Sequence, residues 1–186
     1  MIYPVTVFGD PVLRKKAVPV TKDYQDLKGF IRNMFETMYS SDGVGLAAPQ
    51  VGQPIRVFIL DTTTDEEGEP AGIVKAFINP EILEKYGDEW VMNEGCLSLP
   101  EIREDVLRPE SVRIKYLDED FKVHEEIYSG FTARVIQHEY DHLEGIMFVD
   151  YLNPLKKRIL KSKLIAISKG KVIPKYRIKI PGSKSN

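Results

Sequence analysis

Apolar residues recur at intervals of three and four between about Asp23 and Ser40, which is the pattern of one buried face of an amphipathic helix. The pattern continues through Gly29, a residue that weakens helices, and we still expect the stripe to lie in the core. Its members are Leu27, Phe30, Ile31, Met34, Phe35 and Met38. The pattern therefore predicts an N-terminal helix that packs on the rest of the chain.

Short runs of β-branched and aromatic residues in the middle of the chain predict strands. Two runs, at 55–61 and 73–79, flank an acidic segment from Asp61 to Gly72, which we interpret as an exposed loop. Further on, apolar and polar residues alternate at 112–117, and an acidic turn at 118–120 separates them from a second run at 121–128. This arrangement predicts a β-hairpin.

A second helix is predicted to begin near Thr132. At 100° per residue, several of its apolar residues and two histidines fall within about 60° of one another and so share one face. The residues on this face are Phe131, Val135, His138, His142 and Gly145. The order of helix, strands and helix favours an α+β fold, with short strands and small antiparallel sheets packed around this central helix.

Length and composition narrow the class of protein. The chain has 186 residues, of which 42% are hydrophobic, and this is enough to build the core of one compact domain. No run of eighteen apolar residues occurs, and the N-terminal segment lacks the features of a secretory signal, so we expect neither a membrane span nor export. Cys96 is the only cysteine, which excludes an intramolecular disulfide and favours the cytosol.

The C-terminal part of the chain is strongly basic. Residues 151–186 contain eleven Lys or Arg and no Asp or Glu, although the net charge of the whole chain is −2. The pattern from Leu155 to Ile167 predicts a cationic amphipathic helix, and we expect the end beyond Gly170 to be extended or mobile. We therefore divide the chain into a main domain, 1–154, and a basic C-terminal helix and tail, 155–186. A solvated helix face is the simpler interpretation of this charge, and docking on an anionic surface is the alternative.

Residues 137–142 read Gln-His-Glu-Tyr-Asp-His and are the sharpest chemical signal. Two histidines one helical turn apart can bind one metal ion, while Glu139 lies beside it as a base. The alternative is a helix with ordinary surface histidines. The apolar residues on the same face argue against it, because buried imidazoles need partners.

A catalytic metal site of this type needs a third protein ligand and one open coordination position. No histidine follows His142, and Glu144 lies too close along the same helix. Cys96, in the segment Glu-Gly-Cys-Leu-Ser-Leu-Pro at 94–100, is the upstream candidate, and its thiolate suits Zn²⁺ or Fe²⁺. A lone cysteine is otherwise usually a small buried hydrophobe, so only the histidine pair favours the ligand role.

Residues 43–52 read Gly-Val-Gly-Leu-Ala-Ala-Pro-Gln-Val-Gly and do not have the spacing of a phosphate-binding loop. Small residues at this density allow the backbone to approach a ligand or another strand closely. Gln50 is either an amide donor to a developing oxyanion or a structural hydrogen-bonding residue, and both interpretations remain open on these grounds.

Together the segments at 43–50, 94–98 and 137–143, in this order, resemble the peptide deformylases, as does Gly-Asp-Pro-Val-Leu-Arg at 9–14. The resemblance covers most of residues 1–150. It implies a metal-dependent hydrolase that removes the N-formyl group from the initiator methionine of nascent polypeptides and releases formate. By this resemblance Cys96, His138 and His142 are metal ligands and Glu139 is the catalytic acid and base. The implied ion is Fe²⁺ in the cell, with Zn²⁺ or Ni²⁺ able to occupy the site.

The resemblance also implies that Gln50 and the backbone N–H of Leu97 donate to the oxyanion. Val44 and Gly45 match positions that line the family's substrate cleft, and we add Val135, one turn before His138, to this substrate site.

Two basic residues leave details of the cleft open. Arg134 stands where the family often has an apolar residue, and we expect it to extend to the cleft rim. Arg103 matches a basic position after the cysteine motif, and a solvent-facing salt bridge is an equal alternative to a role with the peptide.

The implied partners are N-formylmethionyl nascent peptides in the bacterial cytoplasm. For such an enzyme, ribosomal RNA is the candidate partner of the basic tail, and no DNA or membrane partner is expected. Two rival functions use the same residues differently. One is a metalloprotease with another third ligand, and the other is an RNA-binding module in which a fourth protein ligand closes a structural metal site.

Overall fold

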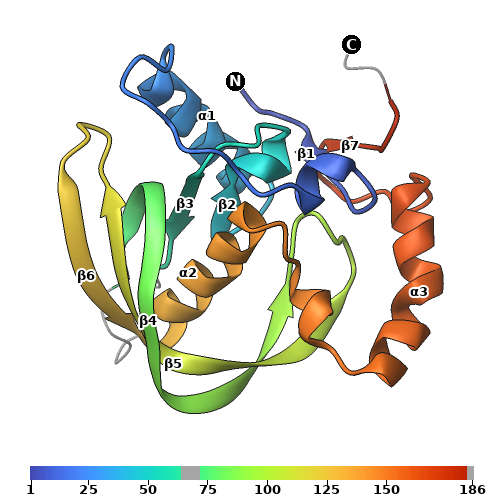
Figure 1. The fold of residues 1–186 in the computed structure, drawn as a ribbon. Coiled ribbons are helices and arrows are strands. Elements are labelled where there is room, and N and C mark those ends of the chain that lie inside the picture. Colours follow the sequence, from blue (N-terminus) through green and yellow to red (C-terminus); the bar gives the residue numbers. More distant parts are fainter. Residues whose placement is uncertain (64–71, 184–186) are drawn as a thin grey trace.

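The computed structural model describes residues 1–63 and 72–183 (Figure 1), so most of the segment predicted as an acidic loop lies outside the described residues. The helices are α1 (Leu27–Ser40), α2 (Gly130–Leu143) and α3 (Pro154–Ser168), with short 3-10 turns at Pro11–Arg14, Ala48–Val51 and Phe148–Tyr151. The strands are β1 (Val5–Thr6), β2 (Gly45–Ala47), β3 (Val57–Asp61), β4 (Val74–Gly95), β5 (Arg103–Leu117), β6 (Val123–Ser129) and β7 (Ile178–Lys179).

Five strands form one antiparallel sheet in the order β2-β3-β4-β5-β6, and α2 packs against it (Figure 1). The predicted mixture of helices and antiparallel sheet is confirmed. The prediction of short strands is wrong for β4, which continues from the expected run at 73–79 to Gly95 and pairs with β5 from Ile78 onward. Register shifts interrupt this pairing at three places, and such bulges hide a long strand from a search for strict alternation.

Helix α1 begins at Leu27, four residues later than the apolar pattern predicted. Asp26 takes a left-handed backbone conformation with φ of 52°, and its Oδ1 accepts a hydrogen bond from the backbone N–H of Gly29 at 3.1 Å. This cap fixes the start of the helix. Most of the predicted stripe is buried against the sheet, and only Phe35 is half-buried.

The C-terminal segment returns to the N-terminus of the chain. Helix α3 matches the predicted cationic helix within one residue at each end. The chain beyond Gly170 was expected to be extended or mobile, and part of it forms β7, which pairs in parallel with β1 through Val5 and Ile178. The division of the chain at residue 154 stays a prediction. None of the helices in the described ranges, 1–63 and 72–183, has the length and apolar character needed to cross a membrane.

Candidate active site

The two histidines of the predicted motif lie one turn apart on α2 and face the same space. Their ring centroids are 5.2 Å apart. Helix α2 ends immediately after His142, and Gly145 then adopts φ of 74° with its Cα against the backbone of Arg14. This conformation favours glycine, and any side chain at this position would collide with the Arg14 backbone. Gly145 therefore allows the chain after α2 to pack closely against Arg14.

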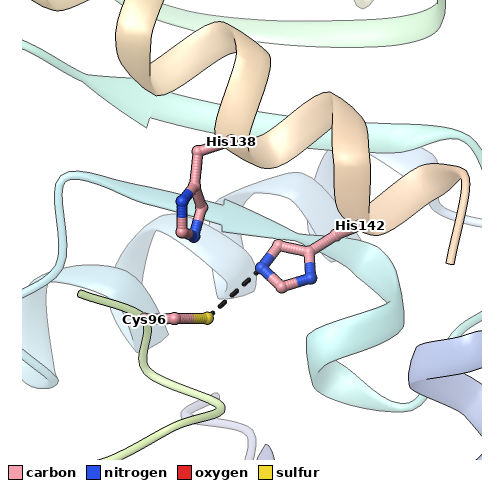
Figure 2. Close-up of side chains that lie close together, drawn as sticks. All are labelled: Cys96, His138 and His142. Carbon is pink, nitrogen blue, oxygen red and sulfur yellow. Dashed lines mark hydrogen bonds between the residues drawn. The ribbon is translucent and has the colours of Figure 1, made fainter. Parts of the chain in front are cut away.

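Cys96 approaches the histidines from the opposite side, on the loop between β4 and β5 (Figure 2). Its Sγ lies 3.3 Å from Nε2 of His142, and one ligand atom from each of the three residues lies within 4.8 Å of the others. The structure thus brings together the three predicted ligands from two distant segments. Their role as ligands stays a prediction at this point.

Glu94 orients the first histidine. The Nδ1 of His138 lies 2.9 Å from Oε2 of Glu94, so an N–H there donates to the carboxylate and leaves Nε2 free to face Cys96. Arg108 donates to both oxygens of Glu94, at 2.7 and 3.1 Å, and also to Asp141 at 2.7 Å. Burial opposes ionisation of Glu94, but the hydrogen bonds from His138 and Arg108 outweigh it and hold its pKa well below the ordinary value.

Arg134 belongs to this buried network, so the prediction that its head group extends to the cleft rim is wrong, although the residue does line the cavity of the site. The residue is only 2% exposed. It donates to Glu94 Oε1 at 3.0 Å and to the carbonyl oxygens of Val106 and Trp90 at 3.1 and 2.6 Å. The guanidinium also stacks over the Trp90 ring at 4.5 Å. Glu94 supplies the negative charge that makes burial of an arginine tolerable at this position.

Burial and the neighbouring charges shift the pKa values of the two histidines in opposite directions. Burial, together with the positive charges of His138 and Arg108, lowers the pKa of His142 well below the ordinary value, which favours the neutral ring. Burial also opposes protonation of His138, but Cys96 and Glu94 beside it raise its pKa.

Glu139 lies beside the cluster of Cys96, His138 and His142 and is 4% exposed. Its Oε2 is buried and has no hydrogen-bond partner within the described part of the chain. Burial raises the pKa of Glu139 to about 7. A carboxyl group with a pKa in this range can both accept and donate a proton near neutral pH.

Gln50 is held in one orientation by the small-residue segment. The backbone N–H of Ala47 donates to Oε1 of Gln50 at 2.7 Å, so the amide nitrogen must point the other way. Nε2 lies 3.4 Å from Cys96 Sγ and 3.3 Å from Ser98 Oγ. The two interpretations of Gln50 are therefore compatible, since one end of the amide is structural and the other faces the site.

A cavity of about 460 Å³ opens onto this cluster, which is a suitable size for a small peptide end. Its lining includes Gln50, Cys96, Leu97, His138 and Glu139 together with the predicted substrate residues Val44, Gly45 and Val135. Arg103 also lines it, and its side chain donates to Asn93 rather than forming an ion pair. His142 is buried and is not among the residues that line the cavity.

Sequence reasoning missed four residues of the site. Glu94 was quoted only as a neighbour of Cys96, and Arg108, Asp141 and Tyr176 were given no role. The position of Glu94 within the cysteine motif was an available signal, whereas Arg108 and Tyr176 lie in segments with no recognisable pattern.

Comparison with known proteins agrees with this arrangement. Residues 2–158 match the family model described as polypeptide deformylase. A peptide deformylase from Christiangramia forsetii is 53% identical, with 99% of this chain and 98% of that protein covered. The crystal structure of a peptide deformylase from Legionella pneumophila is 38% identical and superposes with a TM-score of 0.81 over 92% of this chain and 98% of that one.

A third comparison concerns a structure with a bound peptide. A peptide deformylase from Acinetobacter baumannii, solved with Met-Ala-Ser bound, is 37% identical, with a TM-score of 0.76 over 82% of this chain and 99% of that chain. The family model, the related sequences and the solved structures all indicate the same enzyme family. The chain thus belongs to the polypeptide deformylase family, whose members remove the N-formyl group from nascent peptides.

Proposed function

We propose that this deformylase works with one divalent metal ion bound by Cys96, His138 and His142. The observation that carries the proposal is the convergence of one thiol and two imidazoles, from two separate segments, within 4.8 Å. In this proposal α2 is the central helix of the fold and presents the His-Glu-x-x-His motif to the cleft. Three protein ligands leave a coordination position open, as a catalytic site requires.

Fe²⁺ is our proposed ion in the cell, and Zn²⁺ or Ni²⁺ can replace it. Thiolate and imidazole donors suit all three ions. The carboxylate of Glu94 fits a metal-ligating His138, because such histidines usually donate their other ring N–H to a carboxylate. When bound, the ion supplies Lewis-acid polarisation and lowers the pKa of water in the site.

Glu139 transfers a proton from the attacking water to the leaving nitrogen. As water adds to the formyl carbon, the Glu139 carboxylate accepts the proton that the water loses. The same carboxyl group then donates this proton to the nitrogen as the C–N bond breaks, so the products are formate and a free amino terminus. The unpartnered Oε2 of Glu139 and its pKa of about 7 support this role.

Two donors of the chain stabilise the oxyanion that forms on the formyl oxygen. They are the Nε2 amide of Gln50 and the backbone N–H of Leu97, and both residues line the cavity. Removal of one donor of this kind typically costs about 10² to 10³ in rate. Ala47 fixes the direction of the Gln50 amide before substrate arrives, which reduces the reorganisation needed in the transition state.

The substrate is the N-formylmethionyl end of a nascent peptide. Val44 and Val135 provide apolar surface for the methionine side chain, and Gly45 leaves space beside Glu139. We propose the cytoplasm of a bacterium as the place of action, in agreement with the bacterial relatives.

We further propose that α3 brings the enzyme to the ribosome. The helix presents basic residues at 156, 157, 158, 161 and 163 together with the exposed side chains of Leu155 and Ile159. Arg158 and Lys161 are exposed and form no ion pair within the described ranges, so their charge is available to a polyanion such as RNA.

The deformylase activity is tested by formate release from formyl-Met-Ala-Ser, with metal content measured on the same samples. The wild-type protein should release formate and carry about one equivalent of metal, and Cys96→Ala should lose both. A metalloprotease would tolerate Cys96→Ala and cleave internal amide bonds. A structural metal site would bind metal without releasing formate.

Ribosome docking is tested by co-sedimentation at low salt. The double variant Arg158→Glu, Lys161→Glu should dissociate from ribosomes while formate release persists. The matched control, Lys85→Glu with Lys115→Glu, changes the same charge on exposed residues of the β4–β5 hairpin. Equal sedimentation of both double variants would refute docking through α3.

A further inference from the structure

Tyr176, in the segment that follows α3, reaches the active site from the C-terminal end of the chain. Its Oη donates to the backbone carbonyl oxygen of Leu97 at 2.7 Å, and its side chain lines the same cavity as Cys96 and Glu139. A phenol is protonated at neutral pH and is therefore a steady donor. This contact links the basic tail directly to a residue of the proposed oxyanion site.

Pairing and packing on both sides of Tyr176 hold it in this place. After it, β7 pairs with β1, and the backbone N–H of Val5 donates to the carbonyl oxygen of Arg177 at 2.8 Å. Before it, Val172 packs against the buried cluster that contains Leu99 and Ile102. The tail is thus anchored to the core next to the cysteine loop, and Tyr176 reaches Leu97 from a fixed backbone.

The loop at 96–99 is a turn whose successive peptide groups each have one fixed partner. The N–H of Leu99 donates to the carbonyl of Cys96 at 2.9 Å, and this carbonyl shares its peptide plane with the N–H of Leu97. The N–H of Phe8 donates to the carbonyl of Ser98 at 2.9 Å. Tyr176 holds the peptide group between these two. Without the hydrogen bond from Tyr176, the peptide group that follows Leu97 would lose its partner, and only the hydrogen bonds of the neighbouring peptide groups would restrain the Leu97 backbone.

We propose that Tyr176 is a positioning residue for deformylation, which fixes the turn at 96–99 so that the Leu97 N–H faces the oxyanion. The proposal rests on the proposed role of that N–H. It makes the C-terminal segment part of the active site rather than an appendage. Tyr176 itself takes no part in proton transfer, so its effect is expected in the rate of the chemical step and not in peptide binding.

The test is Tyr176→Phe in the full-length, metal-loaded protein, with formyl-Met-Ala-Ser as substrate. Loss of one positioning hydrogen bond should lower kcat about five- to tenfold and change KM less than twofold. The matched control is Tyr3→Phe, because the hydroxyl of Tyr3 also has one side-chain partner, Asn33 at 3.2 Å, but lies outside the cavity lining. This control should keep the wild-type kcat.

A second measurement separates positioning from a general loss of stability. In the Zn²⁺-loaded protein, hydrogen exchange at the Leu99 amide should be faster in Tyr176→Phe than in the wild type, while exchange in α2 stays the same. An unchanged kcat, a loss carried mainly by KM, or unchanged exchange at Leu99 would overturn the proposal. Absence of formate release by the wild-type protein would instead refute the proposed function, independently of Tyr176.

Discussion

Gly45 lies so close to Glu139 that a methyl group added at Gly45 would come within 2.5 Å of the carboxylate oxygen Oε1 and 2.8 Å of Cδ. Strand β2, which begins at Gly45, therefore packs its backbone directly against the proposed catalytic acid and base. Glycine at this position lets the carboxyl group occupy the space beside the metal ligands.

Gly45→Ala should therefore displace the Glu139 carboxyl group and lower kcat by about 10² or more, which is the lower end of the typical contribution of general acid–base catalysis. Metal content should stay at the wild-type level, because the three atoms nearest to a Cβ at Gly45 all belong to Glu139. Formate release and metal analysis on the same preparation check both parts. A kcat within twofold of wild type would show that Glu139 moves aside at no cost to the reaction.

The contact between Gly45 and Glu139 shows which features could be predicted from the sequence and which could not. The density of small residues around Gly45 predicted a close backbone approach to a ligand or another strand, and the histidine spacing placed Glu139 on a helix. Strand β2 does pair with β3, but Gly45 also lies against a side chain of α2. That Gly45 and Glu139 meet could not be predicted, because it depends on how β2 and α2 pack, and periodicity within one segment carries no information about packing between segments.

Glu139→Gln should retain the metal and lose at least 10² in kcat, because the amide cannot accept the proton from water. The control is Glu144→Gln at the end of the same helix, where the carboxylate pairs with Arg56 and Lys16 at a distance from the cavity lining. This control should keep its activity. Turnover by Glu139→Gln near the wild-type rate would remove Glu139 from the mechanism.

Glu94→Gln should weaken metal binding about 10- to 100-fold, the usual effect of losing a carboxylate that orients a ligating histidine. It should also destabilise the fold by about 3–5 kcal/mol, since Arg108 and Arg134 are buried against this carboxylate. Competition with a metal chelator and urea unfolding measure the two effects. Glu104→Gln, which removes a carboxylate from a surface pair with Lys156, should change neither quantity much.

The network around Glu94 also explains why Arg134 was misinterpreted. A helix wheel gives the direction of a side chain and its neighbours on the same helix, and by that measure Arg134 lies near the cleft. Its partner Glu94 comes from β4, and its other acceptors are carbonyl oxygens of β4 and β5. Backbone acceptors leave no trace in the amino-acid sequence, so a buried arginine could not be distinguished from an exposed one.

A cluster on the sheet makes the stability of the fold depend on pH. Burial alone would raise the pKa of Glu126, but hydrogen bonds from Lys75, Tyr128 and Tyr116 outweigh it and lower the pKa to about 2 from an ordinary value of 4.5. The folded state therefore binds the proton less readily than the unfolded state. The contribution of this carboxylate to stability is complete above pH 4.5 and is lost as the pH falls from 4.5 to about 2.

Glu126→Gln should consequently be less stable than the wild type at pH 6, and the difference in free energy of unfolding should shrink at pH 3. Urea unfolding at several pH values measures this difference, and any metal release at low pH affects both proteins alike. Glu119→Gln serves as the control, because Glu119 is exposed and makes no hydrogen bond or ion pair within the part of the chain that the structure describes. A difference between wild type and Glu126→Gln that stays constant from pH 6 to pH 3 would mean that the cluster stabilises the fold by packing and not by the charge of Glu126.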